Sequence, residues 1–240
     1  MRYQAIVEYD GTKYSGFQSQ PNQNSIQDQI ERALRLMTQQ EIRISASGRT
    51  DKGVHAIGQS IHFDFDILIE SKTWVKALNK RLPGDIRVKK VVRKNINFHA
   101  RYSAKSKIYK YLISKKELSA FENNYLVYYP VFDLNKVKEC INDFIGTHDF
   151  FGLSKYVQGK TTIKTIYSVK IKETKDLITF IFHGNSFLKY MVRSIMGLII
   201  EIGCGKKAPD SIKTILETKD RSLAGKTAPA NGLYLVKVFY

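Results

Sequence analysis

Polar and apolar residues alternate along several stretches of the chain, as they do in strands that bury one face. The stretches are residues 2–10, 60–67, 86–94, 106–114, 165–173, 177–184 and 232–240. Strands of this kind form antiparallel sheets with one wet face, whereas strands of a parallel sheet are apolar throughout. The pattern therefore predicts an α+β fold with mainly antiparallel sheets.

Three segments carry apolar residues at helical spacing. Residues 24–37 begin with Ser25 and Asp28, which resemble a capping box, and residues 133–146 begin at Asp133 and are expected to end at Gly146. The second of these helices is expected to turn inward the side chains of Leu134, Val137, Ile141, Phe144 and Ile145. Residues 185–202 are mostly apolar on every side, so we expect this helix to lie deep between layers.

The elements follow one order twice: strand, helix, strands, helix. The change of unit falls between Ser103 and Lys107. We therefore predict two α+β halves, residues 1–104 and residues 105–240, that share a cleft. The repeat is one of pattern and not of sequence.

Composition adds a strong positive charge to this picture. The 240 residues include 39 Lys and Arg against 22 Asp and Glu, a formal net charge of +17. Such a surplus indicates binding to polyanions, although a Lys-rich proteome is the alternative reading. The two cysteines, Cys140 and Cys204, are far apart and lack metal-ligand spacing, which favours a reducing compartment and no structural zinc.

The sequence shows no signal peptide and no membrane-spanning segment. The N-terminal residues read as a strand and not as a signal peptide. The longest apolar run is broken by Glu201 and is shorter than the roughly 20 residues of a membrane span. We expect a cytoplasmic protein.

The stretch SASGRTDKGVHA, residues 45–56, packs charged residues between two glycines. Gly48 and Gly53 have the spacing of a phosphate-binding P-loop, but Val54 and His55 follow where that loop needs Lys and then Ser or Thr. A solvated turn and a reactive loop at a strand end both remain. In the second case Arg49 would pair with Asp51 and hold its carboxylate ionised, ready to serve as nucleophile or base.

A second cluster mixes cations and aromatic rings, as RNA-binding surfaces do. Its cations are Arg101, Lys105, Lys107 and Lys110, and its rings are Phe98, His99, Tyr102, Tyr109 and Tyr111. The alternative is a half-buried strand with a wet basic face, in which Tyr109 and Tyr111 share one side and Lys110 points away.

Lys189 and Arg193 are four residues apart and should lie together on the third helix. Both could be cations at the helix edge whose charged ends reach water. Alternatively, a buried Arg193 would need a carboxylate or phosphate as its partner. The five histidines show no metal-binding spacing.

The motifs resemble the tRNA pseudouridine synthase A family along nearly the whole chain. SGRTDKGVHA is similar to that family's signature GRTDAGVHA. Further matches are EYDGTKYSGFQSQPNQNSIQ near the start, LPGDI at residues 82–86, FHARYSAKSKIYKY at residues 98–111, FLKYMVRSIMG at residues 187–197 and GLYLVKV at residues 232–238.

The resemblance implies the roles of several residues. Asp51 would be the catalytic carboxylate, Arg49 a residue of its loop, Tyr109 the aromatic ring that stacks on the target nucleoside, and Arg193 the arginine that pairs with Asp51 across the cleft. Further RNA contacts are expected from Lys52, His55, Arg101, Lys105, Lys107, Lys110 and Lys189.

The resemblance also implies a fold, a reaction and partners. The family isomerises uridines 38, 39 and 40 in the anticodon arm of tRNA, as a homodimer without metal or organic cofactor. Each subunit has two RRM-like, ferredoxin-like α+β halves that flank a central active-site cleft.

Two departures from the family pattern concern the target. Lys52 replaces the usual Ala beside Asp51, and residues 150–169 match loosely. The same chemistry on another RNA, such as ribosomal RNA, stays open. So does a non-catalytic RNA-binding or RNA-folding module, although such a module would not need an intact catalytic loop.

Overall fold

The computed structural model describes residues 1–21, 24–156 and 158–240. The chain forms two compact units, one of Met1–Lys105 with Tyr234–Tyr240 and one of Ser106–Leu233. The division at residue 105 is close to the one predicted, but the C-terminal strand belongs with the first unit. The reason is a parallel pairing of Tyr234 with His55, two residues far apart in the sequence, which leaves no local signal.

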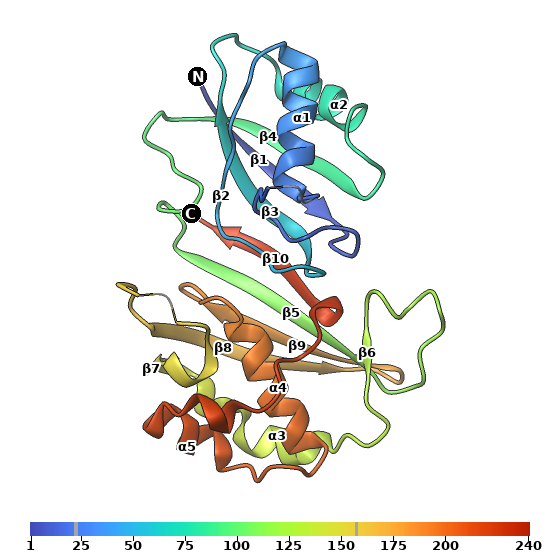
Figure 1. The fold of residues 1–240 in the computed structure, drawn as a ribbon, viewed down its shortest axis with the longest axis vertical. Coiled ribbons are helices and arrows are strands. Elements are labelled where there is room, and N and C mark those ends of the chain that lie inside the picture. The colour runs from blue at the N-terminus through green and yellow to red at the C-terminus, as the bar shows by residue number, and fades with distance from the viewer. Residues whose placement is uncertain (22–23, 157) are drawn as a thin grey trace. The chain divides into compact units, whose positions relative to one another are not determined.

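The first unit is a sheet with two helices (Figure 1). Its elements are β1 (Arg2–Tyr9), α1 (Ile26–Thr38), β2 (Ser45–Ala46), β3 (His55–Asp64), α2 (Ser71–Asn79) and β4 (Ile86–Lys94), with β10 (Leu233–Phe239) added from the end of the chain. The strand order is β4-β1-β3-β10, and β2 pairs with β3. All these pairings are antiparallel except the one between β3 and β10. The predicted preference for antiparallel sheets is confirmed in this unit.

The core of the first unit forms where strand alternation turns rings toward α2. Tyr3 on β1 and Phe63 on β3 are cross-strand partners, and both contact the ring of Trp74 on α2 at centroid distances of 5.3 and 5.1 Å. All three side chains are almost fully buried. At the other helix, Ser25 Oγ accepts a hydrogen bond from the Asp28 amide, so the predicted cap of α1 is confirmed.

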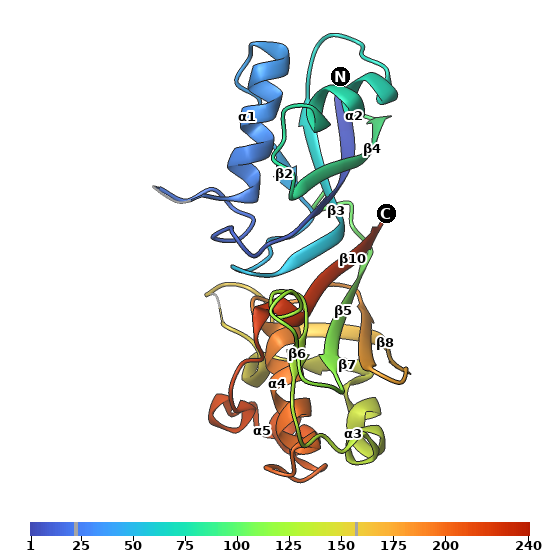
Figure 2. The same ribbon diagram turned by 90° about the vertical axis from the view of Figure 1, so that its right-hand side faces the viewer.

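The strands of the second unit pair mainly in antiparallel fashion. Its strands are β5 (Ser106–Ser114), β6 (Val127–Tyr128), β7 (Gly146–Asp149), β8 (Ile163–Glu173) and β9 (Leu177–Gly184). The order is β5-β9-β8-β7, and β6 pairs in parallel with β5. Its α-helices α3 (Leu134–Cys140), α4 (Met191–Gly203) and α5 (Ser211–Thr218) gather on one side of these strands (Figure 2). Short 3₁₀-helices span Ile141–Phe144, Phe151–Leu153, Arg221–Ala224 and Ala230–Gly232.

The helix predicted over residues 133–146 is shorter than expected. Asp133 caps α3 through the Asn135 amide, as predicted, but the α-helix ends at Cys140 and a 3₁₀ turn follows. Gly146, at φ +116°, opens β7 and does not cap a helix. Ile145 is 39% exposed and is therefore not one of the inward side chains.

The apolar helix α4 is buried along nearly its whole length, as predicted. It begins at Met191 and not at residue 185, because Tyr190 has the left-handed φ of +63° and interrupts helical geometry there. Lys189 consequently lies outside the helix, and the prediction that it shares a helical face with Arg193 is wrong.

Candidate active site

The charged loop of residues 47–54 connects β2 to β3 in the first unit. β2 pairs with the far end of β3, through Ser45 opposite His62, so the loop returns along the sheet to the start of β3 at His55. A turn closes it: the Val54 amide donates to the Asp51 carbonyl at 3.1 Å, and Gly53 has φ +78°. Only glycine adopts that conformation without strain, which accounts for its place in the motif.

The loop backbone is anchored on the side that precedes Asp51. The amide group of Gln59, on β3, donates to the Gly48 carbonyl at 2.8 Å and accepts from Ser47 Oγ at 2.7 Å. The Thr50 carbonyl accepts from the Phe17 amide at 3.1 Å, and Thr50 Oγ1 lies 2.8 Å from the Tyr9 hydroxyl. These contacts fix the backbone up to the residue before the carboxylate.

Two glycines let the N-terminal loop approach the charged loop closely. Gly16 has φ +103°, and a Cβ there would lie 2.9 Å from the Thr50 carbonyl oxygen and 3.3 Å from the Lys52 nitrogen. A Cβ on Gly11 would overlap the Val54 carbonyl. Gly11 and Gly16, in the YDG and SGF motifs of the sequence, therefore allow the N-terminal loop to pack closely against the charged loop.

His55 is a structural contact of the N-terminal loop and not an exposed RNA ligand. Its side chain is 2% exposed, its Nδ1 accepts from the Gly11 amide at 3.1 Å, and its ring stacks on Tyr234 at 4.7 Å. Asp10 Oδ1 lies 3.1 Å from the same Nδ1. The predicted RNA-surface role does not fit this burial.

The charged side chains of the loop differ in exposure. Asp51 is half-buried, whereas Arg49 and Lys52 are exposed. Arg49 forms no ion pair within the part of the chain that the structure describes, so its predicted pairing with Asp51 is not seen. Solvent or a ligand can reach these two cations directly.

Tyr109 lies in the second unit, on β5, opposite Phe182 of β9. Its ring is 8% exposed and meets the edge of Phe187 at 5.1 Å. Tyr111 is fully buried and its hydroxyl donates to the Pro229 carbonyl at 2.9 Å. Lys110 alternates to the other side, and partial burial lowers its pKa. The predicted arrangement of the two tyrosines and the lysine is confirmed.

Arg193 lies in the first turn of α4 and is half-buried. Its Nε donates to the Ala228 carbonyl at 2.8 Å, and its guanidinium lies 5.4 Å from the Tyr190 ring centre. Lys189, outside the helix, contacts the same ring at 5.3 Å. The segment with Ala228 can approach because Gly197 has no side chain: a Cβ there would overlap the Lys226 carbonyl.

The predicted basic cluster is divided between the two units. Arg101 and Lys105 are exposed in the first unit, and Lys107 and Lys110 are half-buried on β5 of the second. The structure thus brings Arg49, Asp51 and Lys52 together in one loop, with Tyr109 and Arg193 in the other unit. Sequence reasoning missed Tyr9, Thr50 and Gln59. The available signal was the pair of polar residues Gln59 and Ser60 between the apolar Ile57 and Ile61 of β3.

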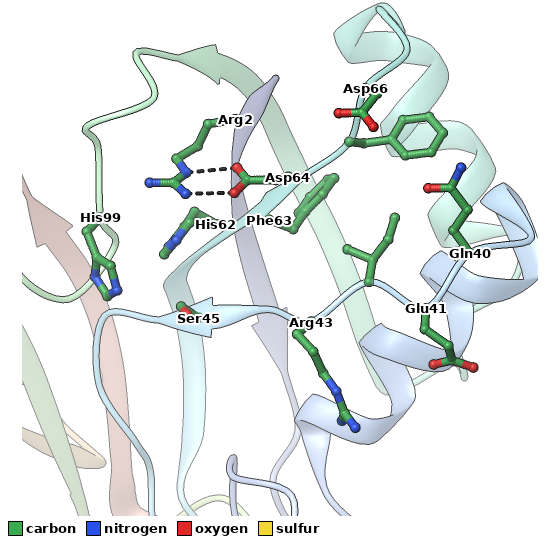
Figure 3. Close-up of a pocket in the computed structure, with 12 residues that line it drawn as sticks. Arg2, Gln40, Glu41, Arg43, Ser45, His62, Phe63, Asp64, Asp66 and His99 are labelled. Atoms are coloured by element: carbon green, nitrogen blue, oxygen red, sulfur yellow. Dashed lines mark hydrogen bonds and ion pairs between the residues drawn. The ribbon is translucent and has the colours of Figure 1, made fainter.

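A depression of about 530 Å³ in the first unit is lined by neither Arg49 nor Asp51 (Figure 3). Arg2 and Asp64 form a bidentate ion pair beside it, at 2.8 and 2.7 Å. His62 and His99 also line it, and burial lowers the pKa of His62 to about 4. Arg2 further donates to the Phe98 carbonyl, so its guanidinium is engaged in holding the loop after β4. We assign this depression a structural role.

Across residues 1–21, 24–156 and 158–240, no three His, Cys, Asp or Glu side chains gather as metal ligands. In the same residues no helix is both long and apolar enough to cross a membrane.

Comparison with known proteins places the chain in a family. The family model described as tRNA pseudouridine synthase matches residues 5–103 and 140–240. The protein named tRNA pseudouridine synthase A of Aster yellows witches'-broom phytoplasma is 43% identical over 238 residues, 99% of this chain and 98% of that one. Its namesake of Geobacillus kaustophilus is 43% identical over 246 residues, 100% and 94% of the two chains.

Solved structures give a weaker likeness. The archaeal box H/ACA sRNP Nop10-Cbf5 complex is similar at 11% identity and a TM-score of 0.36, over 95% of this chain and 58% of that one. Sequence, and not this structural likeness, decides the assignment. On the family model and on full-length identities above two-fifths, the chain belongs to the tRNA pseudouridine synthase family.

Proposed function

We propose that this protein isomerises uridine to pseudouridine in the anticodon stem-loop of tRNA, at positions 38, 39 and 40, with Asp51 as the working group. Family membership supports the reaction class. The observation that carries the residue assignment is the loop itself. Asp51 follows residues that Gln59, Phe17 and Tyr9 hold through hydrogen bonds, and its side chain is only half-buried.

The reaction needs few groups, which this chain can provide. The C1′–N1 glycosidic bond breaks, the uracil turns, C1′–C5 forms and the C5 proton leaves, with no change of formula or redox state. Asp51 assists either by attacking C1′ or by removing the 2′ proton to give a glycal, and both routes need an ionised carboxylate in a fixed direction. The uridine must leave its stack to reach that carboxylate, which costs a few kcal/mol.

Tyr109 and Arg193 have supporting roles in this proposal. The rigid ring of Tyr109, backed by Phe187, would stack on the extruded uracil and repay part of the unstacking cost. Arg193, anchored through its Nε by Ala228, would keep Asp51 ionised by pairing with it. The exposed Arg49 and Lys52 would contact RNA phosphates, together with Arg101, Lys105, Lys107, Lys110 and Lys189.

The proposed architecture is two RRM-like halves around an active-site cleft. The first unit supports it, because the order β1-α1-β2-β3-α2-β4, with β1 between β4 and β3 and β2 beside β3, is that of a ferredoxin-like βαββαβ unit. We further propose a homodimer that acts in the cytoplasm, as the family resemblance implies. Sedimentation at several concentrations tests the dimer.

Primer extension after carbodiimide treatment tests the substrate. Unmodified tRNA and ribosomal RNA are each incubated with the protein, and pseudouridine is mapped at every uridine. The proposal predicts product at positions 38–40 of tRNA alone. Product confined to ribosomal RNA would move the activity to a different target, and tight tRNA binding without product in any RNA would favour a non-catalytic module.

A further inference from the structure

Tyr9 ends β1 directly beneath the charged loop, and its hydroxyl lies 2.8 Å from Thr50 Oγ1. Both side chains are buried, Tyr9 at 4% and Thr50 at 7% exposure. Burial raises the pKa of Tyr9 to about 12, against the opposing effect of hydrogen bonds with Thr50 and Gln59. The phenol therefore keeps its proton at neutral pH and remains a hydrogen-bonding partner for the loop.

Thr50 is the residue immediately before Asp51, and it is held at two independent points. Its carbonyl accepts from the Phe17 amide and its side chain is paired with Tyr9. Gly16 packs against the same carbonyl with no room for a Cβ. Since the Thr50 backbone sets the direction in which the Asp51 Cα–Cβ bond leaves the loop, Tyr9 acts on the carboxylate through Thr50.

We propose that Tyr9 is a positioning residue for the Asp51 carboxylate, acting through its hydrogen bond to Thr50. The proposal rests on the proposed function, because it assigns Tyr9 a role in a reaction at Asp51. Tyr9 itself touches no substrate. Without its hydroxyl the buried Thr50 Oγ1 loses its partner in that direction and the loop gains freedom, while the rest of the strand is unchanged. Misplacement of a reacting group by about 1 Å can cost about 100-fold in rate.

The chain supplies a matched control on the same strand. Tyr3 is also buried, at 2% exposure, and its hydroxyl donates to the Ile67 carbonyl and accepts from the Ile69 amide, each at 3.1 Å. Tyr3→Phe thus removes a buried hydroxyl from β1 without touching the charged loop. A merely structural role for Tyr9 predicts that Tyr9→Phe and Tyr3→Phe behave alike.

The test compares Tyr9→Phe, Tyr3→Phe, Thr50→Val and Thr50→Ser in full-length protein, by pseudouridine formation on tRNA and by urea unfolding. We expect Tyr9→Phe and Thr50→Val to lower kcat about tenfold to 100-fold with KM changed less than about threefold. Thr50→Ser keeps the hydroxyl and should retain most of the kcat. Tyr3→Phe should unfold earlier but keep its kcat. The double variant Tyr9→Phe/Thr50→Val should be no slower than the worse single variant.

Hydrogen exchange of the peptide that contains residues 48–53 gives a second readout that needs no turnover. We expect faster exchange there in Tyr9→Phe than in Tyr3→Phe. Wild-type kcat in Tyr9→Phe, an equal loss in Tyr3→Phe, or unchanged exchange would each overturn the positioning role. If the wild-type protein forms no pseudouridine, the proposed function fails on its own, and the exchange comparison still decides whether Tyr9 holds the loop.

Discussion

The substitution Gly16→Ala places one methyl group against the backbone of the charged loop. Gly16 has φ +103°, where an L-residue is strained by about 1–3 kcal/mol. The new Cβ would meet the Thr50 carbonyl at 2.9 Å and the Lys52 nitrogen at 3.3 Å. These are backbone atoms that cannot rotate away, so overpacking adds about 1–3 kcal/mol. A less flexible unfolded chain returns about 0.4–1 kcal/mol, which leaves a net loss of about 1–5.6 kcal/mol.

Two other glycines separate the two causes in a urea-unfolding assay. Gly159 has φ +75° with nothing within 4 Å of a Cβ, so Gly159→Ala adds strain alone and should cost about 1 kcal/mol. Gly84 has neither a positive φ nor a neighbour within 4 Å, and Gly84→Ala should change the free energy of unfolding by less than about 0.5 kcal/mol.

Activity gives the second arm of the same experiment. Because the methyl group displaces Thr50 and Lys52 on either side of Asp51, Gly16→Ala should lower kcat about 100-fold even where the protein is fully folded. Gly159→Ala and Gly84→Ala should retain wild-type turnover. A Gly16→Ala protein as stable and as active as Gly84→Ala would refute the close packing of the two loops.

Three further substitutions test other parts of the structure. Gly197→Ala should destabilise by more than about 2 kcal/mol in urea, since its Cβ would overlap the Lys226 carbonyl; full stability would contradict that contact. Burial lowers the pKa of His62 to about 4 in the folded protein, so His62 binds a proton more readily in the unfolded chain. The stability that the neutral His62 contributes is therefore present above about pH 6.5 and is lost as the pH falls toward 4. The thermal midpoint of His62→Gln should therefore fall less than that of wild type between about pH 7.5 and pH 5, and parallel pH profiles would contradict this. Tyr109→Leu keeps the apolar volume but removes the ring, and should lower kcat at least about tenfold. Tyr109→Phe keeps the ring and should retain the stacking contribution to kcat. An equal kcat in the two variants would exclude stacking by Tyr109.

Strands were predictable because their signal is local. Residues 86–94 and 106–114 alternate over part of their length, and β4 and β5 occupy those positions. By contrast, EIRISAS leads into the loop with strand-like residues, yet only Ser45–Ala46 pairs with β3. A sheet edge is set by which backbone finds a partner, and that choice depends on the whole fold.

Helix ends show the same limit. Residues 71–79 form α2 although they are few and carry two lysines, because Trp74 and Leu78 dock onto the sheet. No helix was predicted there, nor at α5. Tyr190 delays the start of α4 to Met191, because its φ has a positive value that tyrosine rarely adopts, and its side chain gives no sign of that conformation in the sequence.

The candidate site was predictable as far as its motif reached. Asp51, Arg49 and Lys52 were named from one loop, and they share it in the structure. The groups that hold the loop were not named, because Tyr9 and Gln59 read as ordinary strand residues until the fold places them beneath it. Burial determines such roles and cannot be read from the motif: His55, expected on the RNA-binding surface, is buried against the loop.

The most direct test of the central claim is tritium release from tRNA that carries [5-³H]uridine, compared between wild type and Asp51→Asn. Formation of the C1′–C5 bond expels the C5 hydrogen, so each isomerisation releases one tritium label. We predict release by wild type and a loss of about 100-fold or more in Asp51→Asn, with tRNA affinity within about threefold of wild type by filter binding. Wild-type release from Asp51→Asn would contradict the account.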